Sequence, residues 1–261
     1  MRIAIVIPAR YGSTRFPGKP LAKIGGRSML SRVVDVAREA GSADIIVTTE
    51  DQRIADHAKE IGVECILTSA DCATGSDRVL EAVRKSGKKY DFVINLQGDA
   101  PFTPPEVVAA LINAWTKNPK IEVVTPVHQL NWKDLDRLRE SKKTTPFSGT
   151  TVTIDPQGRA LWFSKTIIPA LRQEDRSTAL SPIYQHIGLY GFTMAVLEKF
   201  CALPQSRYEK LEGLEQLRLL ENGIGVQTVR VEIESGLIQT GIDSPEDLKR
   251  AEALLAKHEA A

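Results

Sequence analysis

The chain has 261 residues, with 34 Lys and Arg, 33 Asp and Glu, and a formal net charge of +1. This near-neutral balance lacks the basic charge of a general nucleic-acid-binding protein, so no nucleic acid partner is expected. Hydrophobic residues make up 42% of the chain, but the apolar runs are too short to span a bilayer, so we expect no membrane insertion. Three cysteines without Cys-x-x-Cys spacing argue against a disulfide framework or a zinc site and fit a cytoplasmic protein.

Short apolar segments alternate with segments of helical periodicity over the first half of the chain. Strands are predicted where apolar residues are consecutive, and helices where they recur at three- and four-residue spacing. This predicts strands at 3–7, 45–49, 63–67, 90–96 and 123–127, and helices at 28–40, 51–61, 76–84 and 104–115. Such alternation indicates an α/β fold with a mostly parallel sheet.

The pattern changes after residue 127. Charged residues with helical spacing are followed by short apolar runs, which predict a helix at 130–145, a hairpin of 150–154 and 160–163, and a strand at 188–192. The earlier alternation then returns, with a helix at 209–221, a strand at 226–231 and a helix at 245–257. We therefore predict a core of residues 1–127 and 204–261, interrupted by a smaller α+β insert at 128–203.

The loop after the first predicted strand is dense in polar and basic residues. It reads Pro8-Ala9-Arg10-Tyr11-Gly12-Ser13-Thr14-Arg15-Phe16-Pro17-Gly18-Lys19-Pro20-Leu21. Ligands of α/β folds bind beyond the carboxyl ends of the strands, where this loop begins. Its glycines permit close backbone approach, and its cations can neutralise phosphate charge. It matches neither the dinucleotide fingerprint nor the P-loop, so it predicts a phosphate site of another kind, with a solvated basic loop as the alternative.

Two aspartates are candidates for a magnesium site. Asp99, in Gln97-Gly98-Asp99, follows the predicted strand at 90–96, and Asp243 precedes the last predicted helix. Mg²⁺ prefers carboxylate and phosphate oxygens and takes only one or two protein carboxylates. Asp99 suits that role, whereas Asp243 fits equally well as support for a helix N-cap at Ser244.

Five stretches of the sequence, in order, resemble the 3-deoxy-manno-octulosonate (Kdo) cytidylyltransferases, the CMP-Kdo synthetases. They are the loop at 8–21, Gln97-Gly98-Asp99, Tyr184-Gln185-His186-Ile187-Gly188-Leu189-Tyr190-Gly191, Leu214-Glu215-Gln216-Leu217-Arg218 and Gly241-Ile242-Asp243-Ser244-Pro245-Glu246-Asp247-Leu248. The resemblance implies a Rossmann-like nucleotidyltransferase sheet. It further implies Mg²⁺-dependent transfer of a cytidylyl group from CTP to a 2-keto-3-deoxy sugar acid, Kdo or a close analogue, with release of pyrophosphate.

The resemblance also assigns roles to individual residues. The nucleotide-binding set is Pro8, Ala9, Arg10, Ser13, Arg15, Lys19, Ser76 and Arg78. The sugar-binding set is Gln97, Lys165, His186, Tyr190, Glu215 and Gln216. Asp99 and Asp243 are the implied magnesium ligands and, together with Arg10 and Lys19, form the catalytic set.

Several of these residues have structural interpretations that the sequence leaves open. Ser76 is also a suitable helix N-cap, and Arg78 suits a surface charge. His186 and Tyr190 fall on one face of a single predicted strand, where a lone buried histidine is usually structural. Glu215 and Gln216 fall on the predicted helix at 209–221, whose leucines we expect in the core.

Three positions depart from the family pattern on the acceptor side. Ala100 replaces an acidic or other polar residue, Thr151 stands where Lys is common, and Lys165 stands where Arg is common. A planar Arg grips a carboxylate at two points and a Lys does not. The identity of the acid sugar therefore stays open. The alternatives are a nucleotidyltransferase for a different acid sugar and a non-catalytic nucleotide-binding homologue.

The insert also predicts a homodimer. Its hairpin does not fit the main parallel sheet and carries Trp162 and Phe163, apolar residues that we expect at the surface. An unpaired hairpin edge is a liability unless it is covered, and the resembled family pairs through this region. Two copies are therefore expected to associate through residues 128–203.

Overall fold

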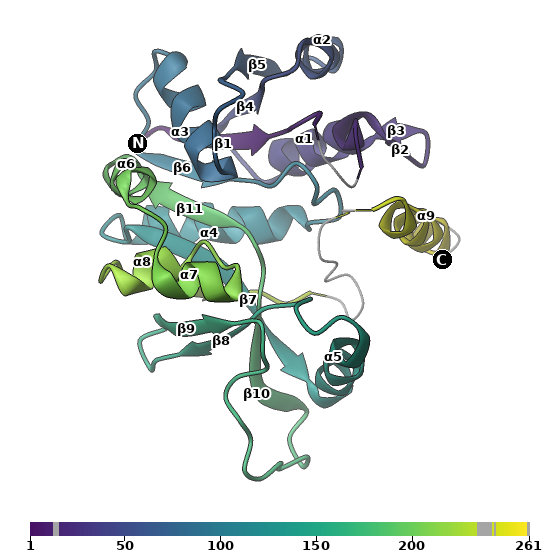
Figure 1. Ribbon diagram of the computed structural model, residues 1–261, viewed down its shortest axis with the longest axis vertical. Helices are drawn as coiled ribbons and strands as arrows, with labels where there is room; N and C mark the ends of the chain where they lie inside the picture. Colours follow the sequence, from purple (N-terminus) through teal and green to yellow (C-terminus); the bar gives the residue numbers. More distant parts are fainter. Residues whose placement is uncertain (13–15, 234–241, 243, 260–261) are drawn as a thin grey trace. The chain divides into compact units, whose positions relative to one another are not determined.

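The chain divides into two compact units. The computed structural model describes residues 1–12, 16–233, 242 and 244–259 (Figure 1). One unit comprises Met1–Ala109 with Gln239–Ala261, and the other comprises Ala110–Ile238. The chain passes from the first to the second within α4 (Pro105–Lys117). The functional division into a nucleotide core and a sugar insert stays a prediction.

A parallel sheet forms the centre of the first unit. Its strands are β1 (Ile3–Pro8), β4 (Asp44–Thr49), β5 (Glu64–Leu67) and β6 (Phe92–Asn95), in the order β5-β4-β1-β6. Ile5 of β1 is in register with Ile45 on one side and Ile94 on the other. Consecutive residues of β1 are fully buried, as in a parallel sheet that is covered on both faces. The predicted α/β class and parallel core are confirmed.

The helices of this unit begin at polar capping residues. They are α1 (Met29–Glu39), α2 (Gln52–Glu60), α3 (Gly75–Lys85) and α9 (Pro245–Glu259). Ser244 caps α9 as predicted, since its Oγ accepts from the Asp247 N–H at 3.1 Å. The suggested Ser76 cap of α3 is wrong. Thr74 caps α3, with Asp77 completing a capping box, because Ser76 lies one residue inside the helix.

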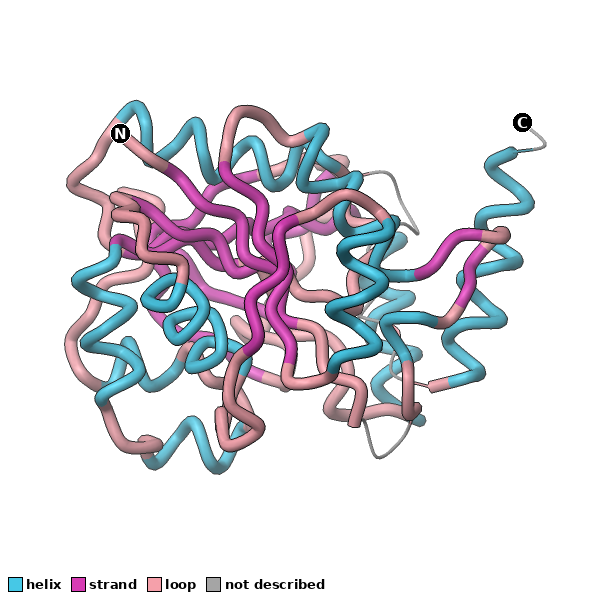
Figure 2. The backbone as a smooth tube through the Cα atoms, turned by 90° about the horizontal axis from the view of Figure 1, so that it is seen from above, coloured by secondary structure: helices cyan, strands magenta, loops and turns pink. Residues whose placement is uncertain are grey.

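A short hairpin, which the sequence pattern did not predict, lies apart from this parallel sheet. It follows the 3₁₀ turn η1 (Lys19–Leu21) and consists of β2 (Lys23–Ile24) and β3 (Arg27–Ser28). The hairpin lies beside α9, the helix that leads to the C-terminus (Figure 2). Buried Ile24, Met29 and Ile242 form a small core there, against which Leu255 of α9 packs.

The strands of the second unit pair in both parallel and antiparallel directions. Its strands are β7 (Val123–Asn131), β8 (Thr151–Ile154), β9 (Ala160–Ser164), β10 (Leu180–His186), β11 (Tyr190–Thr193) and β12 (Gln227–Arg230). β7 runs antiparallel to β10 and β11 and parallel to β12. The predicted hairpin is confirmed as β8 and β9 (Figure 1). The helices are α5 (Trp132–Thr144), α6 (Met194–Ala202), α7 (Arg207–Glu212) and α8 (Leu217–Glu221).

Three features of the second unit differ from the sequence prediction. The sequence pattern missed β10, which contains Pro182; a register shift between Leu180 and Tyr184 accommodates the missing N–H. The helix predicted at 209–221 is two helices, because Gly213 adopts φ 64° and ends α7. Phe163, expected at the surface, is fully buried.

The same break at Gly213 changes which leucines are buried. Leu211, expected in the core, is 70% exposed, whereas Leu214 and Leu217 are buried as predicted. The single periodic pattern had assumed one continuous helix face, and the break at Gly213 interrupts that face. No helix among the described residues is long and apolar enough to cross a membrane.

Candidate functional site

The carboxyl ends of the parallel strands bring the first loop against the Gln97-Gly98-Asp99 turn. The Ala9 N–H donates to the Thr48 carbonyl at 2.9 Å, which continues the parallel pairing one residue past β1. At Gly98 an added Cβ would lie only 2.6 Å from the Pro8 carbonyl oxygen. A side chain at position 98 would therefore push these two segments apart, so glycine is required for their close approach.

Lys19 and Asp99 form the charged centre of this edge. The Lys19 Nζ lies 2.9 Å from the Asp99 Oδ2, and the two side chains are 13% and 31% exposed. Gly18 precedes Lys19 with φ 71°, and its N–H donates to the Tyr11 carbonyl at 2.9 Å, which turns the loop back on itself. The structure therefore brings together two of the four predicted catalytic residues, eighty positions apart in the sequence.

The other members of the first motif are placed less completely. The Arg10 Nη2 donates to the Cys72 carbonyl at 2.6 Å, and its side chain is exposed. Ser13, Arg15 and Asp243 lie outside the described residues. Ile242, the residue before Asp243 in the sequence, donates its N–H to the Asp99 carbonyl at 3.0 Å.

Arg78 is a buried residue rather than the surface charge considered above. It is 1% exposed, donates to the Thr68 Oγ1 at 2.7 Å and lies 3.0 Å from the Glu50 Oε2. Glu50 also accepts the Tyr11 N–H at 3.3 Å. Sequence reasoning missed Glu50, although it directly follows a predicted strand and thus lies at a carboxyl edge, as Asp99 does. Through Glu50, Arg78 of α3 supports the first loop.

Hydrogen bonds through Asn95 link Ser76 of α3 to Gln97. Ser76 is 3% exposed, and its Oγ accepts from the Asn95 Nδ2 at 3.5 Å. The Gln97 Nε2 donates to the Asn95 Oδ1 at 3.1 Å. Asn95 was not among the predicted residues; its signal was a polar side chain at the end of an otherwise apolar strand. These contacts hold Ser76 and Gln97 in one network.

His186 and Tyr190 lie on two strands of the second unit, and their assignment to one strand was wrong. His186 ends β10 and Tyr190 begins β11, because residues 187–189 form a turn. Their rings are nevertheless 5.3 Å apart. The His186 Nε2 lies 2.9 Å from the Thr125 Oγ1. Burial lowers the pKa of His186 to about 3, so its ring is neutral.

Lys165 offers a positive charge in the second unit. Glu212 accepts the Lys165 N–H at 2.7 Å and the Ser164 hydroxyl at 2.8 Å. Within the described part of the chain the Lys165 ammonium itself makes no hydrogen bond or ion pair, while burial lowers its pKa. A half-buried ammonium of this kind can bind an anionic ligand by donating hydrogen bonds to it.

Glu215 and Gln216 lie in the turn between α7 and α8 rather than within one helix. Gln216 is 6% exposed. The pKa of Tyr190 is raised first by burial and then by the charge of Glu215, which indicates that these two groups are neighbours. Arg218 of the same motif is paired with Glu209, Nε to Oε2 at 2.8 Å, with both side chains nearly fully buried. Its contribution is structural, and the sequence analysis did not identify it.

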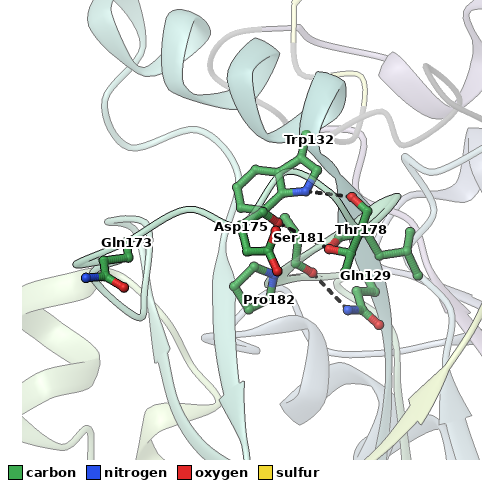
Figure 3. A pocket seen from close by; sticks show the side chains of 8 residues that line it. Gln129, Trp132, Gln173, Asp175, Thr178, Ser181 and Pro182 are labelled. Carbon is green, nitrogen blue, oxygen red and sulfur yellow. Dashed lines mark hydrogen bonds between the residues drawn. The ribbon is translucent and has the colours of Figure 1, made fainter.

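A separate cavity of about 310 Å³ lies in the second unit (Figure 3). It is lined by Gln129, Trp132, Gln173, Asp175, Thr178, Leu180, Ser181 and Pro182. The Trp132 Nε1 donates to the Thr178 carbonyl at 3.0 Å, so the indole joins the start of α5 to the segment before β10 (Figure 3). None of the predicted site residues that the structure describes lines this cavity.

The donor set at Asp99 suits magnesium better than a metal that needs an all-protein site. Among the described residues, no three His, Cys, Asp or Glu side chains are grouped so as to hold a metal ion. Mg²⁺ commonly binds one or two carboxylates together with substrate phosphates. Asp99 is partly exposed and lies beside the Lys19 ammonium. This carboxylate therefore fits Mg²⁺ held jointly with a nucleotide.

Comparison with known proteins agrees with these features. The family described as Cytidylyltransferase matches residues 4–256. The 3-deoxy-manno-octulosonate cytidylyltransferase of Maricaulis maris is 42% identical over 257 residues, which cover 98% of each chain. The chain belongs to the 3-deoxy-manno-octulosonate cytidylyltransferase family. The family member of Anaeromyxobacter dehalogenans (strain 2CP-1) is 41% identical, covering 97% of this chain and 98% of its own.

Solved structures of cytidylyltransferases share the fold of this family member. A CMP:2-keto-3-deoxy-manno-octonic acid synthetase complexed with CTP is 35% identical, with a TM-score of 0.85 over 99% of this chain and 100% of that chain. A cytidylyltransferase from Leptospira borgpetersenii is 18% identical, with a TM-score of 0.63 over 98% of this chain and 87% of that chain. This second likeness concerns the fold alone.

Proposed function

We propose that this chain transfers the cytidylyl group of CTP to the anomeric hydroxyl of Kdo, forming CMP-Kdo and pyrophosphate. Family membership supports the reaction type. The observation that carries the proposal is the Lys19–Asp99 pair, 2.9 Å apart at the carboxyl edge of the parallel sheet. This pair would supply a cation for phosphate oxygens and a carboxylate for Mg²⁺ at one point.

The nucleotide side works by positioning and charge neutralisation. Transfer of a phosphoryl-type group needs these more than covalent catalysis. In the proposal the triphosphate contacts Arg10, Arg15 and Lys19, and the rest of the nucleotide contacts Pro8, Ala9, Ser13, Ser76 and Arg78. The Lys19–Asp99 pair keeps the ammonium oriented before substrate arrives, and a phosphate oxygen then replaces the carboxylate as its acceptor.

Asp99 and Asp243 would hold Mg²⁺ in this proposal. When bound, the ion lowers the pKa of the attacking hydroxyl and stabilises the departing phosphate. The chain's own part is to present Asp99 at a fixed place. Gly98 does so through its close approach to Pro8, and Ile242 does so through its hydrogen bond to the Asp99 carbonyl.

The sugar acid is assigned to side chains of the second unit. Lys165 would bind the carboxylate, since its ammonium is half-buried and makes no hydrogen bond within the described chain. Neutral His186 and the buried Tyr190 hydroxyl are suited to uncharged sugar hydroxyls. Glu215 and Gln216 supply further polar atoms there.

A homodimer through residues 128–203 is also proposed. The fully buried Phe163 no longer supports it, but other large apolar side chains of this region are exposed, namely Phe147 at 76%, Leu161 at 59% and Leu180 at 48%. Covering such residues removes apolar area from water. A dimeric mass in solution at micromolar concentration is expected, and a monomeric mass would contradict the proposal.

Pyrophosphate release across a panel of nucleotides and 2-keto sugar acids tests the function. We expect turnover only with CTP, Mg²⁺ and Kdo or a close analogue such as an amino-substituted Kdo. Equal turnover with UTP or ATP would refute the nucleotide assignment. Binding of CTP without pyrophosphate release for any sugar acid would favour a non-catalytic homologue. Preference for the amino-substituted acid over Kdo would identify the acceptor as a modified sugar, which Thr151 and Lys165 leave open.

A further inference from the structure

Lys142 is a second partly buried lysine beside Lys165, and the function described above does not use it. It lies near the end of α5. Its Nζ donates to the carbonyls of Ser148 at 2.6 Å, Gly149 at 2.9 Å and Lys165 at 2.6 Å. An ammonium has three donors, so these acceptors satisfy it completely. The Pro146 carbonyl lies farther away, at 3.4 Å.

These contacts neutralise none of the positive charge of Lys142. All its hydrogen-bond acceptors are backbone carbonyls, and Glu212, the acid that acts on it, is engaged by the Lys165 N–H and the Ser164 hydroxyl. Burial and the charge of Lys165 both lower the pKa of Lys142. The ammonium groups of Lys142 and Lys165 thus lie in one partly buried region with a single carboxylate, that of Glu212. Such an excess of positive charge is stabilised when an anion binds.

Thr151 holds the segment after Lys165 in place. It is fully buried. Its Oγ1 donates to the Thr166 carbonyl at 2.8 Å and accepts the Ile168 N–H at 3.0 Å. Thr151 therefore fixes the segment after Lys165 and brings no charge, while Lys142 reaches the carbonyl of Lys165 itself.

We propose that Lys142 is a positioning residue for the acceptor's carboxylate. By binding the carbonyls of residues 148, 149 and 165, it fixes the backbone that presents the Lys165 ammonium, and its charge adds to the attraction for the carboxylate. The inference rests on the proposed transfer to a Kdo-like acid.

Steady-state kinetics of Lys142→Met, with Lys143→Met as matched control, test this role. Lys143 is the next residue of α5, is exposed, and pairs with Glu140 at 2.6 Å on the surface. For Lys142→Met we expect the KM for Kdo to rise about tenfold or more, the loss of a charge-assisted contact. The KM for CTP should stay within about twofold, because uniform damage would raise both constants. The control should match the parent enzyme.

Two further variants separate charge from backbone support. Lys142→Gln keeps N–H donors without charge and should also raise the KM for Kdo, whereas Lys142→Arg keeps the charge and should recover part of the loss. An unchanged KM for Kdo in Lys142→Gln, or an equal rise for both substrates in Lys142→Met, would overturn the inference. An unmodified enzyme that releases no pyrophosphate from CTP and Kdo would instead refute the proposed function, and this inference with it.

Discussion

Replacing Gly98 by Ala tests whether the contact between the first loop and the Asp99 turn is required. The added Cβ would lie 2.6 Å from the Pro8 carbonyl oxygen, about 0.8 Å closer than the 3.4 Å at which ordinary contact begins. Gly98 is not among the glycines with positive φ, so alanine is conformationally allowed there. The cost therefore comes from the clash with a backbone atom, which cannot rotate away as a side chain can.

The size of the effect follows from this geometry. Overpacking of this kind costs about 1–3 kcal/mol, which for a domain of this size lowers the unfolding midpoint by roughly 2–12 °C. The clash also moves Asp99 and the Pro8 end of the loop. Since misplacement by about 1 Å can reduce turnover roughly 100-fold, we expect pyrophosphate release to fall by about 10- to 100-fold.

Gly75→Ala provides the matched control, because it adds a methyl group beside the same proline. Its Cβ would lie 3.7 Å from the Pro8 Cγ, an ordinary contact, and the residue begins α3. The unfolding midpoint should be unchanged or raised, since alanine stabilises a helix by about 0.5–1 kcal/mol over glycine. Both variants would be followed by thermal unfolding and pyrophosphate release. Parental stability and turnover in Gly98→Ala would refute the reasoning.

The remaining predictions concern charge. Asp99→Ala and Asp243→Ala should each abolish Mg²⁺-dependent pyrophosphate release. In Asp99→Ala, loss of the partly exposed pair with Lys19 should lower the free energy of unfolding in urea by only about 1 kcal/mol or less. Near-normal turnover in Asp243→Ala would return that residue to support of the α9 cap. Arg218→Met should lower the free energy of unfolding by about 3–5 kcal/mol, because Glu209 is left as a buried unpaired carboxylate; a urea midpoint close to that of the parent would contradict this. Burial lowers the pKa of His186 from 6.5 to about 3, so below pH 6.5 the unfolded chain binds a proton that the folded chain does not. The free energy of unfolding should therefore fall as the pH drops from about 6.5 to about 3, and less steeply in His186→Gln; equal slopes would exclude this contribution.

Local patterns in the sequence were sufficient for the parallel core and for the start of α9. The consecutive apolar residues of β1 predicted a buried strand, and Ser244 with Asp247 predicted the start of α9. The first loop and Asp99 were found for a similar reason: the loop directly follows a strand that the pattern locates, and Asp99 belongs to the short turn after another. These features depend on residues within a few positions of each other, where strand and helix periodicity apply.

Burial and pairing between distant segments were decided only by the tertiary structure. The surface interpretation of Arg78 failed because its partners Glu50 and Thr68 come from the ends of two other strands. Lys142 resembles any lysine of a charged helix until the segment at 148–149 and the carbonyl of Lys165 fold against it. Sequence periodicity indicates which side of a helix or strand is apolar. It does not indicate which distant polar group will satisfy a charge once water is removed, and that pairing determines whether burying the charge is tolerated.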